Sequence, residues 1–269
     1  MFNLFRMDLR RLVRTRSFYI ILVVTAALIM MLVALVATVA DPEKIDSLQS
    51  SGMVVTTGSD EEISAEIHSM TQLDFAHECL SSGFLLMIIC IGVTLFVHGD
   101  FSSGTIKNIC FAHPQRWEYI LSKILLTGVY SGIVMILGVL VSLAGPILFG
   151  LRLPASPVGS ILQYAFWLWL PYWGFGLMGL ALVLLTRSST LSIIMATLSG
   201  CGLIGIFLQY LCQRLGWPDL ERYLLSSVAT TQCMPMLGAE EMTMILACVA
   251  GWGALYIAGS LVMIEKRDI

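Results

Sequence analysis

Charged residues are scarce in this sequence of 269 residues: they make up 12% of it, whereas hydrophobic residues make up 57%. A soluble globular domain is about one quarter charged. The mean hydropathy, +0.86, points the same way. The composition therefore excludes an ordinary soluble domain and indicates a protein that crosses a membrane several times.

Motifs of nucleotide-binding and hydrolytic sites are missing as well. None of the four lysines follows the glycines of a phosphate-binding GxxxxGK[ST] loop. There is no HExxH zinc motif and no GxSxG nucleophile motif. We therefore expect no catalytic residue, no bound metal and no bound cofactor, and any ATP must be held by another chain.

Cysteines occur in an odd number, seven, mostly inside apolar runs and without a CxxC pair. This pattern argues against a disulfide framework and against a zinc site. Cys79 and Cys233 both fall in segments expected on the outer side, so a disulfide between these two is left open. The four histidines are scattered and are expected to be ordinary polar residues.

Ionisable residues are also nearly absent from the long apolar runs, where Gln163 and Gln209 are the strongly polar side chains. Proton-coupled and ion-coupled carriers usually place charged groups near the middle of the membrane. A proton-driven secondary transporter is therefore disfavoured.

What the sequence does have is a series of apolar runs long enough to cross a hydrocarbon core of about 30 Å. We predict one all-α membrane domain over residues 1–269 with six transmembrane helices. The predicted spans are 18–40, 80–98, 124–150, 161–186, 190–211 and 242–264. Gly128 and Gly132 form a GxxxG pair, which indicates close packing inside the bundle. Pro171, among several aromatic residues, predicts a kink or break in the fourth span.

Five arginines lie in residues 1–17, interleaved with apolar residues that recur every three or four positions. This spacing predicts an amphipathic helix. Such a helix could lie on the inner leaflet with its arginines near anionic lipid. Alternatively, the segment only orients the first span, and the sequence leaves both interpretations open.

Two loops are expected on the outer side. Residues 41–79 hold nine carboxylates against the single cation of Lys44, and Ser59 with Glu62 forms a capping-box pattern that predicts a helix there. Residues 212–241 contain apolar pieces too short to span, so they are expected to dip into the membrane as a re-entrant loop.

The distribution of cations sets the predicted orientation. With residues 99–123 inside, eleven Lys and Arg residues lie on the inner side and four on the outer side. Positive charges accumulate on the cytoplasmic side of membrane proteins. The sequence therefore predicts a multi-pass protein with both termini in the cytoplasm.

The inner segment 99–123 carries a recognisable combination of an acidic residue, a Gly-Thr pair, two basic residues and a closing lysine. These residues are Asp100, Gly104, Thr105, Lys107, Arg116 and Lys123. Their order and spacing resemble the signature of type-2 ABC exporter permeases, and the likeness extends over nearly the whole chain. The sequence departs from that pattern at Pro114, just before the basic residue, and in its enlarged first outer loop, which is more similar to permeases of peptide-antibiotic immunity and export.

The resemblance implies a transport subunit in the cytoplasmic membrane of a bacterium. A cytoplasmic coupling helix within 99–123 would contact an ABC ATPase, present in two copies and carrying ATP and Mg. A second permease subunit, identical or related, and membrane lipids are the other implied partners, and no nucleic acid is expected. The implied cargo is a hydrophobic or amphipathic peptide, drug or lipid, with an antimicrobial peptide preferred.

The residues themselves are compatible with this role. Gly104 and Thr105 suit the turn and cap that would start a short helix. Asp100 could pair with Lys107, with Arg116 or with the basic N-terminal helix. The alternative from another class is a non-transporting sensor or scaffold that binds a peptide through the acidic outer loop.

Overall fold

The computed structural model describes residues 2–40, 67, 69–105, 116–216, 222–235 and 237–266, and every regular element among them is helical. The longer helices are α1 (Phe2–Arg14), α2 (Arg16–Val39), α5 (Gln72–Leu80), α6 (Phe84–Ser102), α8 (Arg116–Leu148), α9 (Val158–Thr186), α10 (Ser189–Gly200), α11 (Leu203–Leu215) and α13 (Ala239–Lys266). The short α12 (Leu225–Ser227) and the π-helix η2 (Val228–Gln232) precede α13.

Five helices are long and apolar enough to cross a membrane, namely α2, α6, α8, α9 and α13. A sixth span results if α10 and α11 are counted as one broken helix, bent by 64°. The predicted all-α, multi-span architecture is therefore confirmed at this level.

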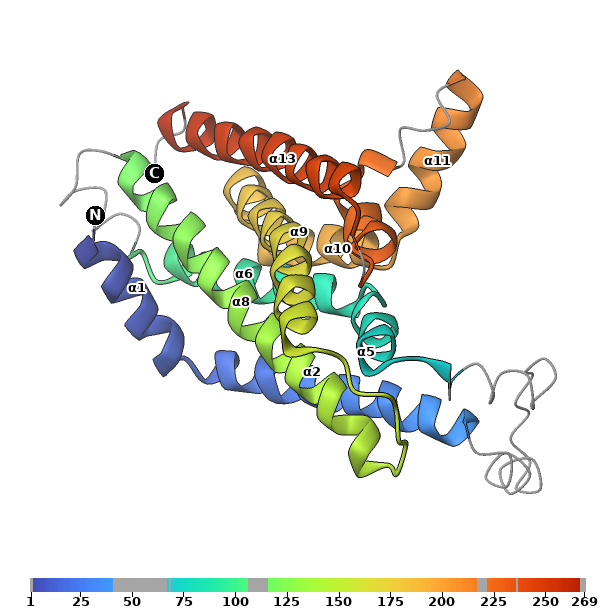
Figure 1. The fold of residues 1–269 in the computed structure, drawn as a ribbon. Helices are drawn as coiled ribbons and strands as arrows, with labels where there is room; N and C mark the ends of the chain where they lie inside the picture. The colour runs from blue at the N-terminus through green and yellow to red at the C-terminus, as the bar shows by residue number, and fades with distance from the viewer. Residues whose placement is uncertain are drawn as a thin grey trace, which may run out of the picture.

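Helix α9 forms the centre of the bundle. It packs against α6, α8, α10 and α13, and α2 packs against α8 on the outside (Figure 1). The most apolar stretch of α9 is 61% buried, against 22% for those of α2 and α13. Because a bilayer is as apolar as the exposed leucines and valines of these outer helices, such exposure suits a membrane and not water.

The GxxxG pair in α8 packs against two tryptophans of α9. A Cβ added at Gly128 would lie 3.1 Å from Trp173 Cε2, and one at Gly132 would lie 3.4 Å from Trp169 Nε1. Trp169 Nε1 donates a hydrogen bond to the Gly128 carbonyl at 3.1 Å. The prediction that the glycine pair packs inside the bundle is thus confirmed. Helix α9 continues through Pro171, so the helix does not break there, and the alternative of a kink stays a prediction.

Helix α5 occupies the end of the segment predicted as an outer loop. A capping box starts it, because Thr71 Oγ1 accepts from the Asp74 amide while the Asp74 carboxylate accepts from the Thr71 amide. Six of its nine residues are buried, and the Leu80 carbonyl at its end accepts a 2.6 Å hydrogen bond from Tyr172. The rest of the acidic loop up to residue 66, including the predicted capping box at Ser59 and Glu62, lies outside the described residues.

The second predicted span, 80–98, is shifted in the structure. Gly83 adopts φ +74, a left-handed conformation that separates α5 from α6. Helix α6 then begins at Phe84 and continues to Ser102, past the expected end at residue 98. Helix α8 likewise begins at Arg116, well before residue 124. Residues 99–123 are therefore not one polar loop, because both neighbouring helices extend into them.

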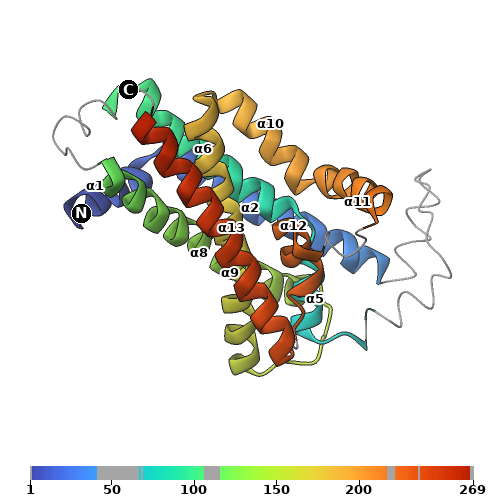
Figure 2. The same cartoon turned by 90° about the horizontal axis from the view of Figure 1, so that it is seen from above.

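The fifth predicted span, 190–211, is two helices and not one. Gly202 has φ +74, and the chain bends there between α10 and α11. Helix α11 leaves the bundle in both views (Figures 1 and 2).

In the segment after α11, Leu225 packs on Gly174 of α9, and Val228 and Cys233 are buried. These apolar pieces of the predicted re-entrant loop thus lie against protein, and their depth in a membrane stays a prediction.

Helix α1 lies across one end of the bundle, beside the end of α6 and the start of α8 (Figure 1). The C-terminal end of α13 lies at the same end of the molecule. Leu4, Asp8 and Leu12, each four residues apart, form the buried face of α1, which packs against α8. Residues 2–14 are thus helical, while an amphipathic helix that lies on a lipid leaflet stays a prediction.

Candidate functional site: a buried charge cluster

Three helices bring four charged side chains together at the end of the bundle crossed by α1. Asp8 comes from α1, Asp100 from α6 and Lys123 from α8, and all three are at most 1% exposed. Arg11, one turn after Asp8 on α1, is the half-buried fourth member. We call these four residues the charge cluster.

The cluster is held by three ion pairs. Lys123 Nζ lies 2.8 Å from Asp8 Oδ1 and 2.6 Å from Asp100 Oδ2. Arg11 Nη1 lies 2.7 Å from Asp100 Oδ1. Two cations and two carboxylates make the cluster formally neutral, which is the condition for burying charge in an apolar bundle.

Two hydrogen bonds from α8 add to these ion pairs. Tyr119 donates its hydroxyl to Asp100 Oδ2 at 3.1 Å, and Ser122 donates its hydroxyl to Asp8 Oδ2 at 2.8 Å. The Lys123 ammonium also lies 4.7 Å from the centre of the Phe96 ring, within cation–π range. Each carboxylate oxygen of Asp8 and Asp100 therefore has an ion-pair or hydrogen-bond partner.

The arrangement fixes how α1, α6 and α8 sit relative to one another. Removing one member of a buried ion pair leaves an uncompensated charge and costs about 3–5 kcal/mol. Lys123 reaches both carboxylates, so it connects α8 to α1 and to α6 at once. The cluster can hold three helix ends as one unit.

The six residues expected to couple to an ATPase divide into three groups in the structure. Asp100 and Lys123 are buried in the charge cluster, where each finds an opposite charge, and their role in coupling to an ATPase stays a prediction. Of the partners considered for Asp100, the N-terminal helix is the one found, through Arg11. Lys107 lies outside the described residues, and Arg116 is described by its backbone alone, as the first residue of α8.

Gly104 and Thr105 lie in the turn that follows α6. Gly104 has φ +66, which a glycine adopts without strain. Its amide donates to the Phe101 carbonyl at 3.2 Å, and the hydroxyls of Ser103 and Thr105 lie 2.7 Å apart. This turn begins the connecting segment, residues 103–115, which joins α6 to α8.

Asp8 is the member that sequence reasoning missed. It is the lone carboxylate among the N-terminal arginines, and it occupies the same helical stripe as Leu4 and Leu12. An acidic residue on an apolar stripe of a basic helix was the available signal, since such a position requires a buried cation nearby.

Other candidate chemistry receives no support from the described residues. Among them no three His, Cys, Asp or Glu side chains are close enough to hold a metal ion. Cys79 and Cys233 are both buried free thiols. His77 is buried near the other end of the bundle, with Nδ1 3.1 Å from the Tyr164 hydroxyl.

Comparison of the sequence with protein-family models and with curated proteins finds no match. The function must therefore be argued from the residues and from the geometry.

Proposed function

We propose that this chain is the transmembrane permease subunit of an ATP-driven ABC exporter. A separate ATPase subunit, present in two copies, binds ATP and Mg and hydrolyses the nucleotide. Two permease subunits, identical or related, enclose the path for the cargo. Both termini and the connecting segment lie on the cytoplasmic side of a bacterial membrane in this proposal.

The observation that carries the proposal is the position of the charge cluster. Asp100 lies three residues before the connecting segment, and Lys123 lies eight residues after it. The 2.6 Å pair between them therefore joins the two helices that the segment links. A segment that must transmit force needs such a rigid base, because slack at the helix ends would absorb the movement.

Helix α1 extends that base. The pairs of Asp8 with Lys123 and of Arg11 with Asp100 tie the N-terminal helix to the same point. In a low-dielectric surrounding these ion pairs resist separation. A displacement of the connecting segment by an ATPase would consequently move α1, α6 and α8 together.

The cargo we favour is a hydrophobic or amphipathic peptide of the antimicrobial kind. Residues 41–79 carry nine carboxylates against one lysine, a balance that attracts cationic molecules at the outer surface. The alternative for this loop is a solvated acidic face that binds no ligand.

Co-purification tests the proposal. The chain is co-expressed with an ATPase from an adjacent reading frame that has a Walker A motif and no transmembrane helix. We expect the two to purify together, and the double variant Thr105→Ala/Lys107→Glu to lose the ATPase. Gly104 is kept because its backbone requires glycine.

The matched control is Arg152→Ala, an exposed residue in the loop between α8 and α9. It should retain the ATPase fully. If the Thr105→Ala/Lys107→Glu variant retains as much ATPase as wild type, the coupling role of the segment is contradicted.

A further inference from the structure

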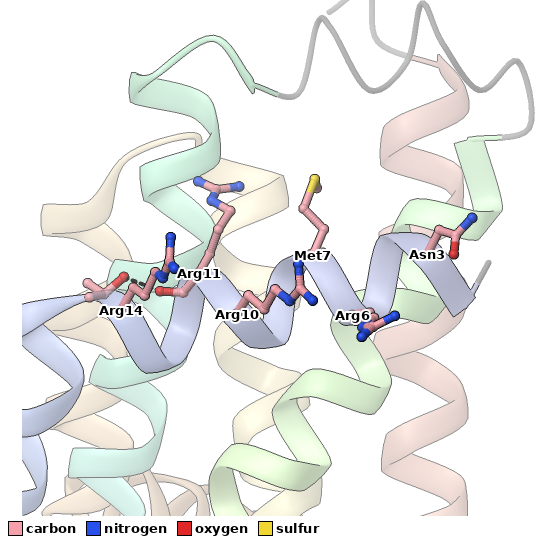
Figure 3. Close-up of a pocket in the computed structure, with 7 residues that line it drawn as sticks. Asn3, Arg6, Met7, Arg10, Arg11 and Arg14 are labelled. Carbon is pink, nitrogen blue, oxygen red and sulfur yellow. Dashed lines mark hydrogen bonds between the residues drawn. The ribbon is translucent and has the colours of Figure 1, made fainter.

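A hollow of about 450 Å³ runs along the surface of α1 (Figure 3). Its lining residues are Asn3, Arg6, Met7, Arg10, Arg11, Arg14 and Thr15. Four of the seven are arginines, and no carboxylate is among these lining residues. A surface with several arginines and no carboxylate attracts anions.

The four arginines are not equivalent. Arg11 is neutralised by Asp100, and Figure 3 shows it on a different side of α1 from Arg6 and Arg10. Arg6, Arg10 and Arg14 are exposed and follow one another every four residues. At that spacing their guanidinium groups share one face of the helix. The hollow thus presents three cations that form no ion pair with the described residues.

A second, smaller cavity of about 50 Å³ adjoins the first. Thr15 lines both, and the rest of its lining is mainly apolar, including Leu12, Phe18 and Phe96. The Tyr130 hydroxyl borders this cavity and has no hydrogen-bond partner among the described residues, although Tyr130 is only 3% exposed.

Gly92 makes room for that hydroxyl. A Cβ added at Gly92 would collide with the Tyr130 oxygen. A buried hydroxyl without a partner costs free energy, so a polar atom is expected to reach it. The cavity therefore has an apolar wall and one hydrogen-bond donor, and it shares Thr15 with the arginine-lined hollow.

We propose that the junction of α1 and α2 binds one anionic phospholipid. Arg6, Arg10 and Arg14 hold its phosphate headgroup, since guanidinium and phosphate pair through two parallel hydrogen bonds. The ester region of the lipid passes Thr15 and accepts a hydrogen bond from Tyr130. Helix α2, which starts at Arg16 and exposes apolar side chains such as Ile20 and Val23, gives the acyl chains a lipid-facing surface.

This ligand follows from charge and polarity together. A free phosphate would use the arginines and leave the apolar cavity and Tyr130 unexplained, whereas a neutral lipid would leave the arginines unexplained. The proposal does not depend on the transport function, because any protein with these helices in a membrane would offer the same site.

Native mass spectrometry of the purified full chain tests the proposal. The chain in detergent is titrated with dioleoyl phosphatidylglycerol, and separately with dioleoyl phosphatidylcholine and with soluble glycerol phosphate. We expect one phosphatidylglycerol molecule to be retained in preference to the other two. Arg6→Gln/Arg10→Gln should weaken its binding roughly thirtyfold, because each arginine near an anionic lipid strengthens binding roughly five- to sixfold. Tyr130→Phe should weaken it severalfold.

Two matched controls accompany these variants. Arg152→Gln/Arg214→Gln removes two exposed arginines elsewhere, and Tyr19→Phe removes the hydroxyl of an exposed tyrosine on α2. Both should bind phosphatidylglycerol like wild type. Equal binding by the Arg6→Gln/Arg10→Gln variant overturns the headgroup site. Unchanged binding by Tyr130→Phe shows surface attraction without a defined lipid site, and equal occupancy by glycerol phosphate shows a phosphate site, so either result also overturns the proposal.

Discussion

Lys123 is the residue on which the charge cluster depends, because its ammonium group contacts Asp8 and Asp100 at once. The sequence pointed to Asp100 and Lys123 through their place around the Gly-Thr pair, and it offered the basic N-terminal helix as one partner of Asp100. Their burial could not be foreseen, since it requires the position of α1, and no local pattern specifies which helix crosses that end of the bundle. At the residue scale, the motif singled out two members of the charge cluster, and their role toward an ATPase stays a prediction.

Lys123→Met should destabilise the protein by about 3–5 kcal/mol, because Asp8 would lose its cation while Asp100 would keep Arg11. Thermal unfolding in detergent, followed by circular dichroism, measures the effect. The informative comparison is Asp8→Asn/Lys123→Met, which keeps the Arg11 to Asp100 pair and leaves no unpaired charge.

We expect that double variant to unfold within about 1–2 kcal/mol of wild type, since replacing both partners of a buried pair is far less costly than replacing one. If the single and double variants are equally unstable, the loss comes from packing and not from charge, and the cluster does not work as described.

His77 should make the stability of the protein depend on pH. Burial lowers the pKa of His77 from its usual 6.5, against the opposing influence of Glu78 and Asp74. Below pH 6.5 the unfolded chain therefore binds a proton that the folded chain resists, so the free energy of unfolding falls as the pH drops from 6.5 towards the lowered pKa.

Thermal unfolding of wild type at pH 7.5 and pH 5.5 measures this effect, and His77→Gln should reduce the difference between the two pH values. An identical pH dependence in the variant would show that other groups are responsible.

At the scale of elements, two helices pack closely where the sequence has small residues. The GxxxG pair of α8 indicated close packing, and the two tryptophans of α9 fill the space. Helix ends were harder to predict than helix centres. Helices α6 and α8 extend into the polar stretch because Asp100 and Lys123 are neutralised inside the protein, whereas hydropathy alone ends a span at the first charges.

Gly128→Leu should separate α8 from α9 and destabilise the protein by about 1–3 kcal/mol, because its side chain would meet the Trp173 ring. Thermal unfolding in detergent measures the loss. The control is Gly159→Leu, where an added Cβ meets no atom within 4 Å. Equal melting temperatures for the two variants would contradict the described packing of α8 on α9.

At the scale of the whole molecule, composition was sufficient to predict a helical membrane bundle, because the apolar runs are long and nearly free of charge. The course of the fifth span was not predictable: α10 and α11 together have the length and hydropathy of one span, and the 64° bend depends on the backbone of Gly202. The place of α1 across the end of the bundle also needed tertiary structure. That place gives the molecule a single end where α1, α6 and α8 meet the connecting segment.

ATP hydrolysis in proteoliposomes tests whether this chain is a permease subunit coupled to a separate ATPase. The measurement requires no knowledge of the cargo. The rate is measured for the chain alone, for the partner ATPase alone and for both together. We expect no hydrolysis by the chain alone and faster hydrolysis by the ATPase when the wild-type chain is present. The Thr105→Ala/Lys107→Glu variant should lose that stimulation. Hydrolysis by the chain alone, or stimulation that this variant leaves unchanged, would contradict the proposed function.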